Sequence, residues 1–228
     1  MGVVNQSGRR VSTLARRTLV AAVLGFSAFS TLLGMRALIT FEQTAGSVGA
    51  APLRWPASSA VKRFKGHPEI LVFVHPFCSC TDATMAELAQ LSVRKKPGAI
   101  TPAITVLFYR PRGSGWVPNG LWRTAQSFEN AHVVWDDDGR EANKFGARTS
   151  GYTLLYNAEG NLLFRGGVTG SRGHRGDNDG LDELAASLDS QSPARAASRV
   201  FGCALGSSDK ELGGSDRDGS DKERDARL

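Results

Sequence analysis

Thiols are scarce in this 228-residue chain, which contains only three cysteines. It also lacks the motifs of several common functions. The formal net charge is +6, but no basic stripe is interleaved with aromatic residues, so we predict no nucleic-acid partner. No nucleophile-elbow motif supports Ser-His-Asp hydrolysis. The glycines of 166–170 lack the following lysine and helix of a phosphate-binding loop. The cysteines are therefore the main chemical feature.

Charged residues are missing from one long segment, 18–35, which follows a basic flank of four arginines, Arg9, Arg10, Arg16 and Arg17. At about 1.5 Å per residue this segment covers roughly 27 Å, close to the hydrocarbon thickness of a bilayer. We predict a basic cytoplasmic N-terminus over 1–17 and a transmembrane anchor or signal segment over 18–35. Cleavage as a signal peptide stays open. Because a basic flank stays inside, the rest is predicted to be extracytoplasmic (periplasmic), on a single-pass protein of the inner or plasma membrane.

The remainder divides into a linker over 36–66, a folded domain over 67–190 and a polar, disordered tail over 191–228. An apolar island at 200–205 interrupts the tail and carries Cys203. Hydrophobic periodicity within the domain alternates between strand and helix. The predicted strands are 69–75, 104–109, 132–135, 152–156 and 162–164, and the predicted helices are 81–94, 121–128, 140–145 and 181–188. This order predicts an α/β fold, with a central sheet that ends in an antiparallel hairpin and is flanked by helices.

The stretch LVFVHPFCSC, 71–80, places Cys78 and Cys80 where a buried strand meets a helix. Strand, cysteine motif and helix together resemble the thioredoxin-like fold, and the segment FGARTSGYTLLYNAEGNLLFRGG, 145–167, is similar to the second half of that fold. The resemblance covers about 69–188. In outline it is nearest to membrane-tethered extracytoplasmic thioredoxin-like proteins of bacteria.

This resemblance implies a thiol–disulfide oxidoreductase in which Cys78 is the nucleophile and Cys80 the resolving thiol. A thiolate at a helix N-terminus is stabilised by backbone N–H groups and the helix dipole, and a protonated His75 would add to this effect. The partners would be protein thiols or disulfides, and no small organic cofactor is expected. The hypothesis requires the Cys78 sulfur to be exposed and partly ionised.

Two departures from the family pattern stand out. Only Ser79 separates the cysteines, where the family usually has two residues. Gly151, preceded by Ser150, stands where the family usually has a cis-proline. We still expect Thr149, Ser150 and Gly151 to line the substrate groove opposite Cys78.

The short cysteine spacing has physical consequences. Cα atoms two residues apart in an extended chain lie about 6.5–7 Å from each other, at the limit for a disulfide. A Cys78–Cys80 disulfide would therefore be strained and easily reduced. The pair would act as an oxidant or isomerase, or stay reduced and bind something.

Alternative functions remain open. Cys78 and Cys80, with His75 or the remote His174, offer soft sulfur and imidazole ligands for copper. Copper-delivery proteins of cytochrome oxidase assembly share the fold and the tether, although their cysteine spacing is wider. A non-catalytic binding module is the third alternative, so enzyme status stays open with the oxidoreductase favoured. Cys203 is interpreted as an anchor for its island, a second resolving thiol, or a lipid or metal contact.

Overall fold

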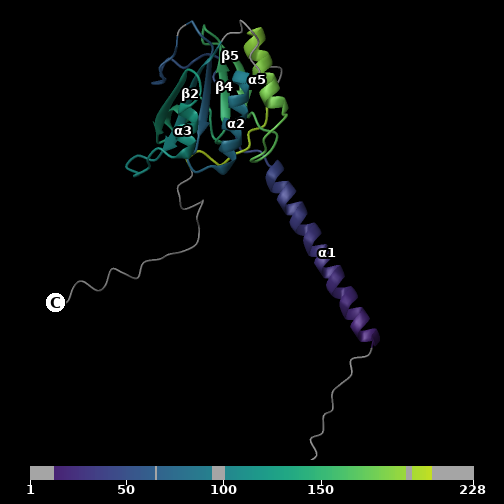
Figure 1. Ribbon diagram of the computed structural model, residues 1–228. Coiled ribbons are helices and arrows are strands. Elements are labelled where there is room, and N and C mark those ends of the chain that lie inside the picture. Colours follow the sequence, from purple (N-terminus) through teal and green to yellow (C-terminus); the bar gives the residue numbers. More distant parts are fainter. Residues whose placement is uncertain (1–12, 65, 94–100, 194–196, 207–228) are drawn as a thin grey trace, which may run out of the picture. The chain divides into compact units, whose positions relative to one another are not determined.

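The computed structural model describes residues 13–64, 66–93, 101–193 and 197–206, with backbone only for 92–93 (Figure 1). The chain divides after Gln43 into an N-terminal helix and a compact domain. Residues 1–12 of the predicted basic flank and 207–228 of the predicted tail lie outside the described residues.

Helix α1 (Thr13–Gln43) has 31 residues, none of them buried. It is long and apolar enough to cross a membrane. The prediction of an apolar N-terminal segment is confirmed, and the helix extends beyond the predicted 18–35 at both ends. These properties suit a signal anchor and a signal peptide alike.

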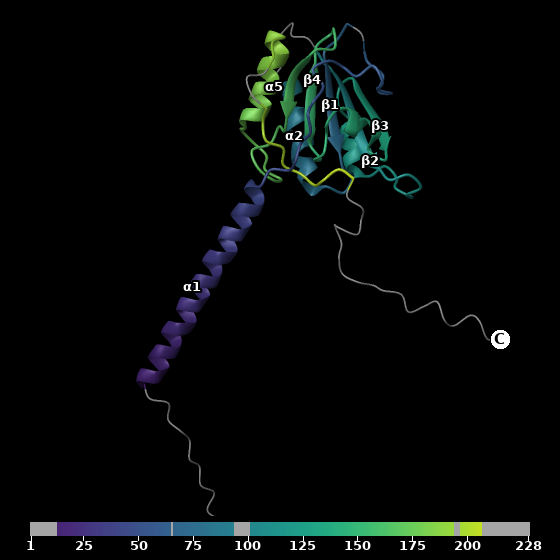
Figure 2. The ribbon, with the colours of Figure 1, turned by 180° about the vertical axis from the view of Figure 1, so that it is seen from behind.

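The domain is built on a five-stranded mixed sheet in the order β3-β2-β1-β4-β5 (Figure 2). Its strands are β1 (Glu69–Val74), β2 (Ala103–Arg110), β3 (Ala131–Asp137), β4 (Tyr152–Tyr156) and β5 (Leu162–Gly166). Strands β1, β2 and β3 run parallel, whereas β4 is antiparallel to β1 and to β5. The predicted α/β class and terminal antiparallel hairpin are confirmed.

Helices and loops cover both faces of the sheet, as the complete burial of β1 requires. The helices are α2 (Ser79–Val93), α3 (Gly120–Gln126), α4 (Arg140–Lys144) and α5 (Asp179–Ser190). Ile70, Val72 and Val74 pack in one core cluster with α2, α3 and α5. Leu71 and Phe73 point to the opposite face, where the helical contribution comes from the short α4.

Segments on either side of the predicted domain complete that second face. Residues 36–43 of the predicted linker belong to α1, and residues farther along pack on the domain. The Trp55 ring lies 5.2 Å from that of Phe145 and 5.3 Å from that of Tyr156. From the predicted tail, Val200 and Phe201 are buried. The folded unit is therefore longer than 67–190, because these apolar residues cover sheet surface that α4 leaves open.

Candidate functional site

Cys78 lies in the turn between β1 and α2, one residue before the helix begins. Its N–H donates to the His75 carbonyl at 3.0 Å, and its own carbonyl accepts from Thr81 N–H at 3.1 Å. The fully buried strand fixes the start of the turn and α2 fixes its end. The sulfur is thus held beside the N-terminal turn of a 15-residue helix.

The Cys78 sulfur is covered, with 3% of the residue exposed, so the expectation of an exposed sulfur was wrong. The cover comes from the predicted tail: Cys203 N–H donates to Cys78 Sγ at 3.2 Å. A hydrogen bond from the Cys203 thiol is the largest cause that lowers the pKa of Cys78, to about 4, and Thr81 lowers it through its hydroxyl and N–H. Burial acts in the opposite direction and is outweighed. Cys78 is therefore a thiolate held by donors from two segments.

The other two thiols lie next to this thiolate and are protonated. Burial first, and then the negative charge of Cys78, raise the pKa of Cys80. The pKa of Cys203 is raised by its hydrogen bond to Cys78, by burial and by the same charge. The Arg172 guanidinium lowers the pKa of both, and it also donates to the Gly202 carbonyl at 2.8 Å. Three thiols and one fixed cation therefore converge at the start of α2.

Ser150, one of the residues predicted to line a groove, contacts the turn that carries Cys78. Ser150 Oγ accepts from His75 N–H at 2.7 Å and shares a 2.6 Å hydrogen bond with Thr81 Oγ1. Ser150 N–H donates to the Cys203 carbonyl at 2.8 Å, and Thr149 forms an antiparallel bridge with Ala204. The backbone of 148–150 is therefore paired with the chain's own tail.

Gly151 follows directly and has a φ of +89°. Its N–H donates to the Phe73 carbonyl at 2.8 Å. Proline has no N–H and a φ near −65°, so this backbone excludes the proline that the family usually has here. The described peptide bonds are all trans.

His75 is buried among aromatic rings rather than presented to Cys78. Its ring stacks on Tyr109 at 5.9 Å and meets Trp116 edge-on at 5.5 Å. Nδ1 accepts from Phe77 N–H at 3.3 Å. The imidazole is not among the groups that lower the pKa of Cys78, so its visible role is to shape the turn.

His174 is exposed in the loop after β5, and its N–H donates to the Ser171 carbonyl. Arg172, two residues earlier, reaches the thiols instead. Across the described ranges, no group of three or more His, Cys, Asp or Glu side chains is arranged to hold a metal ion. The geometry thus brings Cys78 and Cys80 together, but it does not complete a copper site with a histidine.

Comparisons with known proteins find similarity in structure but not in sequence families. No protein-family model and no curated protein matches the sequence. An uncharacterized conserved protein of Geobacillus kaustophilus is similar in structure, with 13% identity over 73% of this chain and 93% of that one, at a TM-score of 0.51. A hypothetical protein of Sinorhizobium meliloti 1021 has 14% identity over 72% of this chain and 95% of that one, at 0.50. A secreted Mycobacterium tuberculosis disulfide oxidoreductase aligns at 16% identity over 55% of this chain and 83% of that one, at 0.38.

The fold is thioredoxin-like. At these identities the likeness concerns architecture alone, and the chemistry has to be argued from the residues of this chain.

Sequence reasoning missed Arg172 and Thr81 and left Cys203 open. The apolar island around Cys203 was a usable signal, because an apolar run in a polar tail needs a surface to cover it. Arg172 gave no such signal, since it is one of several arginines in a polar loop. Thr81 was read as part of a helix without a role for its hydroxyl.

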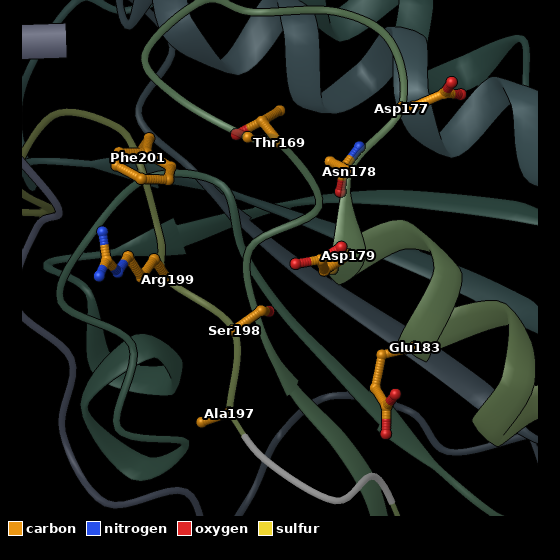
Figure 3. A pocket seen from close by; sticks show the side chains of 11 residues that line it. Thr169, Asp177, Asn178, Asp179, Glu183, Ala197, Ser198, Arg199 and Phe201 are labelled. Carbon is orange, nitrogen blue, oxygen red and sulfur yellow. The ribbon is translucent and has the colours of Figure 1, made fainter. Parts of the chain in front are cut away.

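A separate hollow of about 620 Å³ lies between the loop before α5, the start of α5 and residues 197–201 (Figure 3). The carboxylates of Asp177, Asp179 and Glu183 and the side chain of Arg199 are on its lining. None of the three cysteines lines it. This hollow is therefore distinct from the thiol site, although the same tail segment borders both.

Proposed function

We propose that this protein is a membrane-anchored thiol–disulfide oxidoreductase that reacts through Cys78 with thiols or disulfides of other proteins. The main support is the thiolate at the start of α2, which accepts hydrogen bonds from Cys203 and Thr81. A thiolate, and not a thiol, is the nucleophile in disulfide exchange. A sulfur with a structural role alone would gain nothing from this set of donors.

The first exchange is an attack by Cys78 Sγ on one sulfur of a partner disulfide. A bond forms between Cys78 and that sulfur, the partner's S–S bond breaks, and the second partner sulfur leaves as a thiolate that takes up a proton. Residues 148–150 carry backbone donors and acceptors that suit an extended partner segment, as their pairing with residues 203–205 illustrates. A second thiol then has to release the partner, and the sequence predicts Cys80.

Helix α1 supports an extracytoplasmic location for this chemistry. With its basic flank inside, it would tether the domain on the extracytoplasmic face, where disulfides form and persist. The copper alternative has weaker support, because His174 is exposed and its hydrogen bond is local. The non-catalytic module is disfavoured by the ionised sulfur.

The test uses the full chain in detergent micelles and a variant in which Cys78 is the single thiol, Cys80→Ser with Cys203→Ser. Serine keeps a hydroxyl that can hydrogen-bond to the Cys78 sulfur. With fluorescent glutathione disulfide at pH 6, this variant should form a stable one-to-one mixed disulfide. Cys78→Ser, which keeps the other two thiols, should form at least about tenfold less, since burial still raises the pKa of Cys80 and Cys203 when the Cys78 thiolate is gone.

Ser79→Ala is the matched control, because Ser79 lies between the cysteines and is exposed. It should leave adduct formation unchanged. The proposal is wrong if the single-thiol variant forms adduct only after it is unfolded in urea.

A further inference from the structure

The segment Val200–Leu205, here the docked tail segment, crosses the end of the sheet at which α2 begins (Figures 1 and 2, yellow). It pairs antiparallel with residues 148–150. Ser150 N–H donates to the Cys203 carbonyl at 2.8 Å, and Leu205 N–H donates to the Arg148 carbonyl at 2.8 Å. These two bonds flank the bridge between Thr149 and Ala204 as in a regular antiparallel ladder.

Residue types along the docked tail segment fit this pairing closely. A Cβ at Gly202 would lie 2.0 Å from the Ser150 carbonyl oxygen, so no other residue can approach the groove in this way. Arg172 also donates to the Gly202 carbonyl. Upstream, Ser198 Oγ donates to the Gly167 carbonyl at 2.7 Å. The segment is therefore held in a defined register, which places Cys203 directly over Cys78.

The two candidate partners of Cys78 differ in their backbone constraints. Cys80 is two residues away on the same turn and helix, so a bond to it requires a bent and strained backbone. Both thiols hydrogen-bond to Cys78, but Cys203 comes from a separate segment, and its N–H contacts Cys78 Sγ as well. A Cys78–Cys203 disulfide would join two facing segments and needs no bend within one turn.

We propose that Cys203 is the resolving thiol, which forms the intramolecular disulfide with Cys78 and releases the partner. This inference rests on the proposed function and adds to it a residue far from the cysteine motif. The docked tail segment leaves the groove when a partner enters and returns to expel it, since both use the backbone of 148–150.

The exchange balances as follows. After the first exchange, Cys78 is bonded to a partner sulfur. Cys203 Sγ attacks Cys78 Sγ, the Cys78–Cys203 bond forms, the bond to the partner breaks, and the partner sulfur leaves with the proton lost by Cys203. The partner disulfide has gained two electrons and two protons and become two thiols, while Cys78 and Cys203 have become a disulfide. A dithiol partner is oxidised by the same two exchanges run backwards.

Electrostatics favours this order of events. The pKa of Cys203 is raised by its hydrogen bond to the Cys78 thiolate, by burial and by the charge of that thiolate. Once Cys78 is in a mixed disulfide, its charge and that hydrogen bond are gone, while Arg172 still lowers the pKa of Cys203. Cys203 therefore becomes easier to ionise at the step that needs its thiolate.

Peptide mapping of the oxidised full chain tests the inference. Trypsin leaves Cys78 and Cys80 together in peptide 66–94 and Cys203 in peptide 200–210. After oxidation with one equivalent of glutathione disulfide and alkylation of free thiols, the two peptides should be joined. Cys80→Ser should keep the cross-link, which assigns it to Cys78, and Cys203→Ser should lose it. In Cys203→Ser the glutathione adduct on Cys78 should persist at least about tenfold longer than in Cys80→Ser.

Gly202→Ala provides a variant that keeps all three thiols. It should reduce the yield of the cross-link several-fold, whereas the control Gly170→Ala should not, because a Cβ at Gly170 meets nothing closer than 3.7 Å. An oxidised chain whose disulfide lies within peptide 66–94 would overturn the inference. If Cys78 then still forms its mixed disulfide in the single-thiol variant, the proposed function stands without it.

Discussion

The ionised state of Cys78 predicts an unusual pH dependence for its reaction with a small disulfide reagent. For an ordinary cysteine with a pKa of about 8.5, the thiolate fraction falls about 800-fold between pH 8 and pH 5. The hydrogen bonds from Cys203 and Thr81 lower the pKa of Cys78 to about 4. Its thiolate fraction should therefore fall by only about a tenth over the same range.

The absolute rate separates two opposing effects. Nucleophilicity falls with pKa with a Brønsted slope of about 0.4–0.5, so a thiolate whose pKa is about 4.5 units lower reacts roughly 100-fold more slowly. At pH 5 the larger thiolate fraction outweighs this loss by about 30-fold, and at pH 8 the ordinary cysteine reacts faster. The two rates should cross near about pH 6.5 before accessibility is considered. Burial of Cys78 lowers its rate equally at every pH and leaves the flat profile intact.

The assay follows modification of the single-thiol variant, Cys80→Ser with Cys203→Ser, by hydroxyethyl disulfide between pH 4 and 9, using intact-protein mass. The same variant in urea supplies the reference for an ordinary cysteine. A companion variant, Cys80→Ser with Cys203→Ala, lacks the hydroxyl and so removes one hydrogen bond to a charged group. Such a bond is worth about 1.5–3 kcal/mol, so the pKa of Cys78 should rise by roughly one to two units.

A rate that falls tenfold per pH unit from pH 8 downward in the folded single-thiol variant would refute the reasoning. It would mean that burial outweighs the donors around the sulfur, and that Cys78 is an ordinary buried thiol. Equal profiles for the serine and alanine variants would show instead that the side chain at position 203 does not hold the thiolate.

Two further changes test the framework of the site by urea unfolding of the full chain in micelles. Gly151→Pro, which introduces the residue usual in the family, should destabilise the domain by about 3 kcal/mol or more. The reason is that φ at Gly151 is +89° and its N–H donates to the Phe73 carbonyl. An unchanged urea midpoint would contradict this backbone conformation. Asp136→Ala should cost about 1–2 kcal/mol of stability, because the Asp136 carboxylate accepts hydrogen bonds from the Glu141 and Ala142 N–H groups at 2.8 Å each. The control is Asp137→Ala, which removes a partly exposed ion pair with Arg110 and should cost less than about 1 kcal/mol. Equal losses for the two aspartates would show that the two hydrogen bonds to Asp136 contribute little.

Much of the sheet could be predicted from the sequence because its signals are local. The run Ile70–Val74 is apolar at every position, and β1 is buried on both faces. The helix after Cys78 followed from the spacing of Met85, Leu88 and Leu91, all of which lie in the core. Each of these patterns reflects which side chains of a single segment are buried.

The docking of the flanking segments was beyond the same reasoning, because residues 44–64 and 197–206 have no periodicity. Their places are set by fits between distant positions, such as Gly202 against the Ser150 carbonyl. The cover over Cys78 depends on that fit, and so does the donor that ionises it. For the same reason, sequence reasoning named His174 in the loop after β5 and missed Arg172, which lies beside the thiols.

The docked tail segment both covers the Cys78 sulfur and supplies donors that lower its pKa. Access of a partner to Cys78 therefore depends on whether this segment is docked. Beyond Gly202, the ladder bonds from Ser150 to Cys203 and from Leu205 to Arg148 hold the docked tail segment. At about 1 kcal/mol net each, they favour the docked state by about 2 kcal/mol, which leaves roughly 3% of molecules open. A bulky partner that binds only the open state would meet Cys78 about thirtyfold less often. In the open state water replaces the donors from Cys203, while Thr81 and the start of α2 remain beside the sulfur. Docking therefore limits which partners reach Cys78, and in the open state Thr81 and the start of α2 alone favour its thiolate.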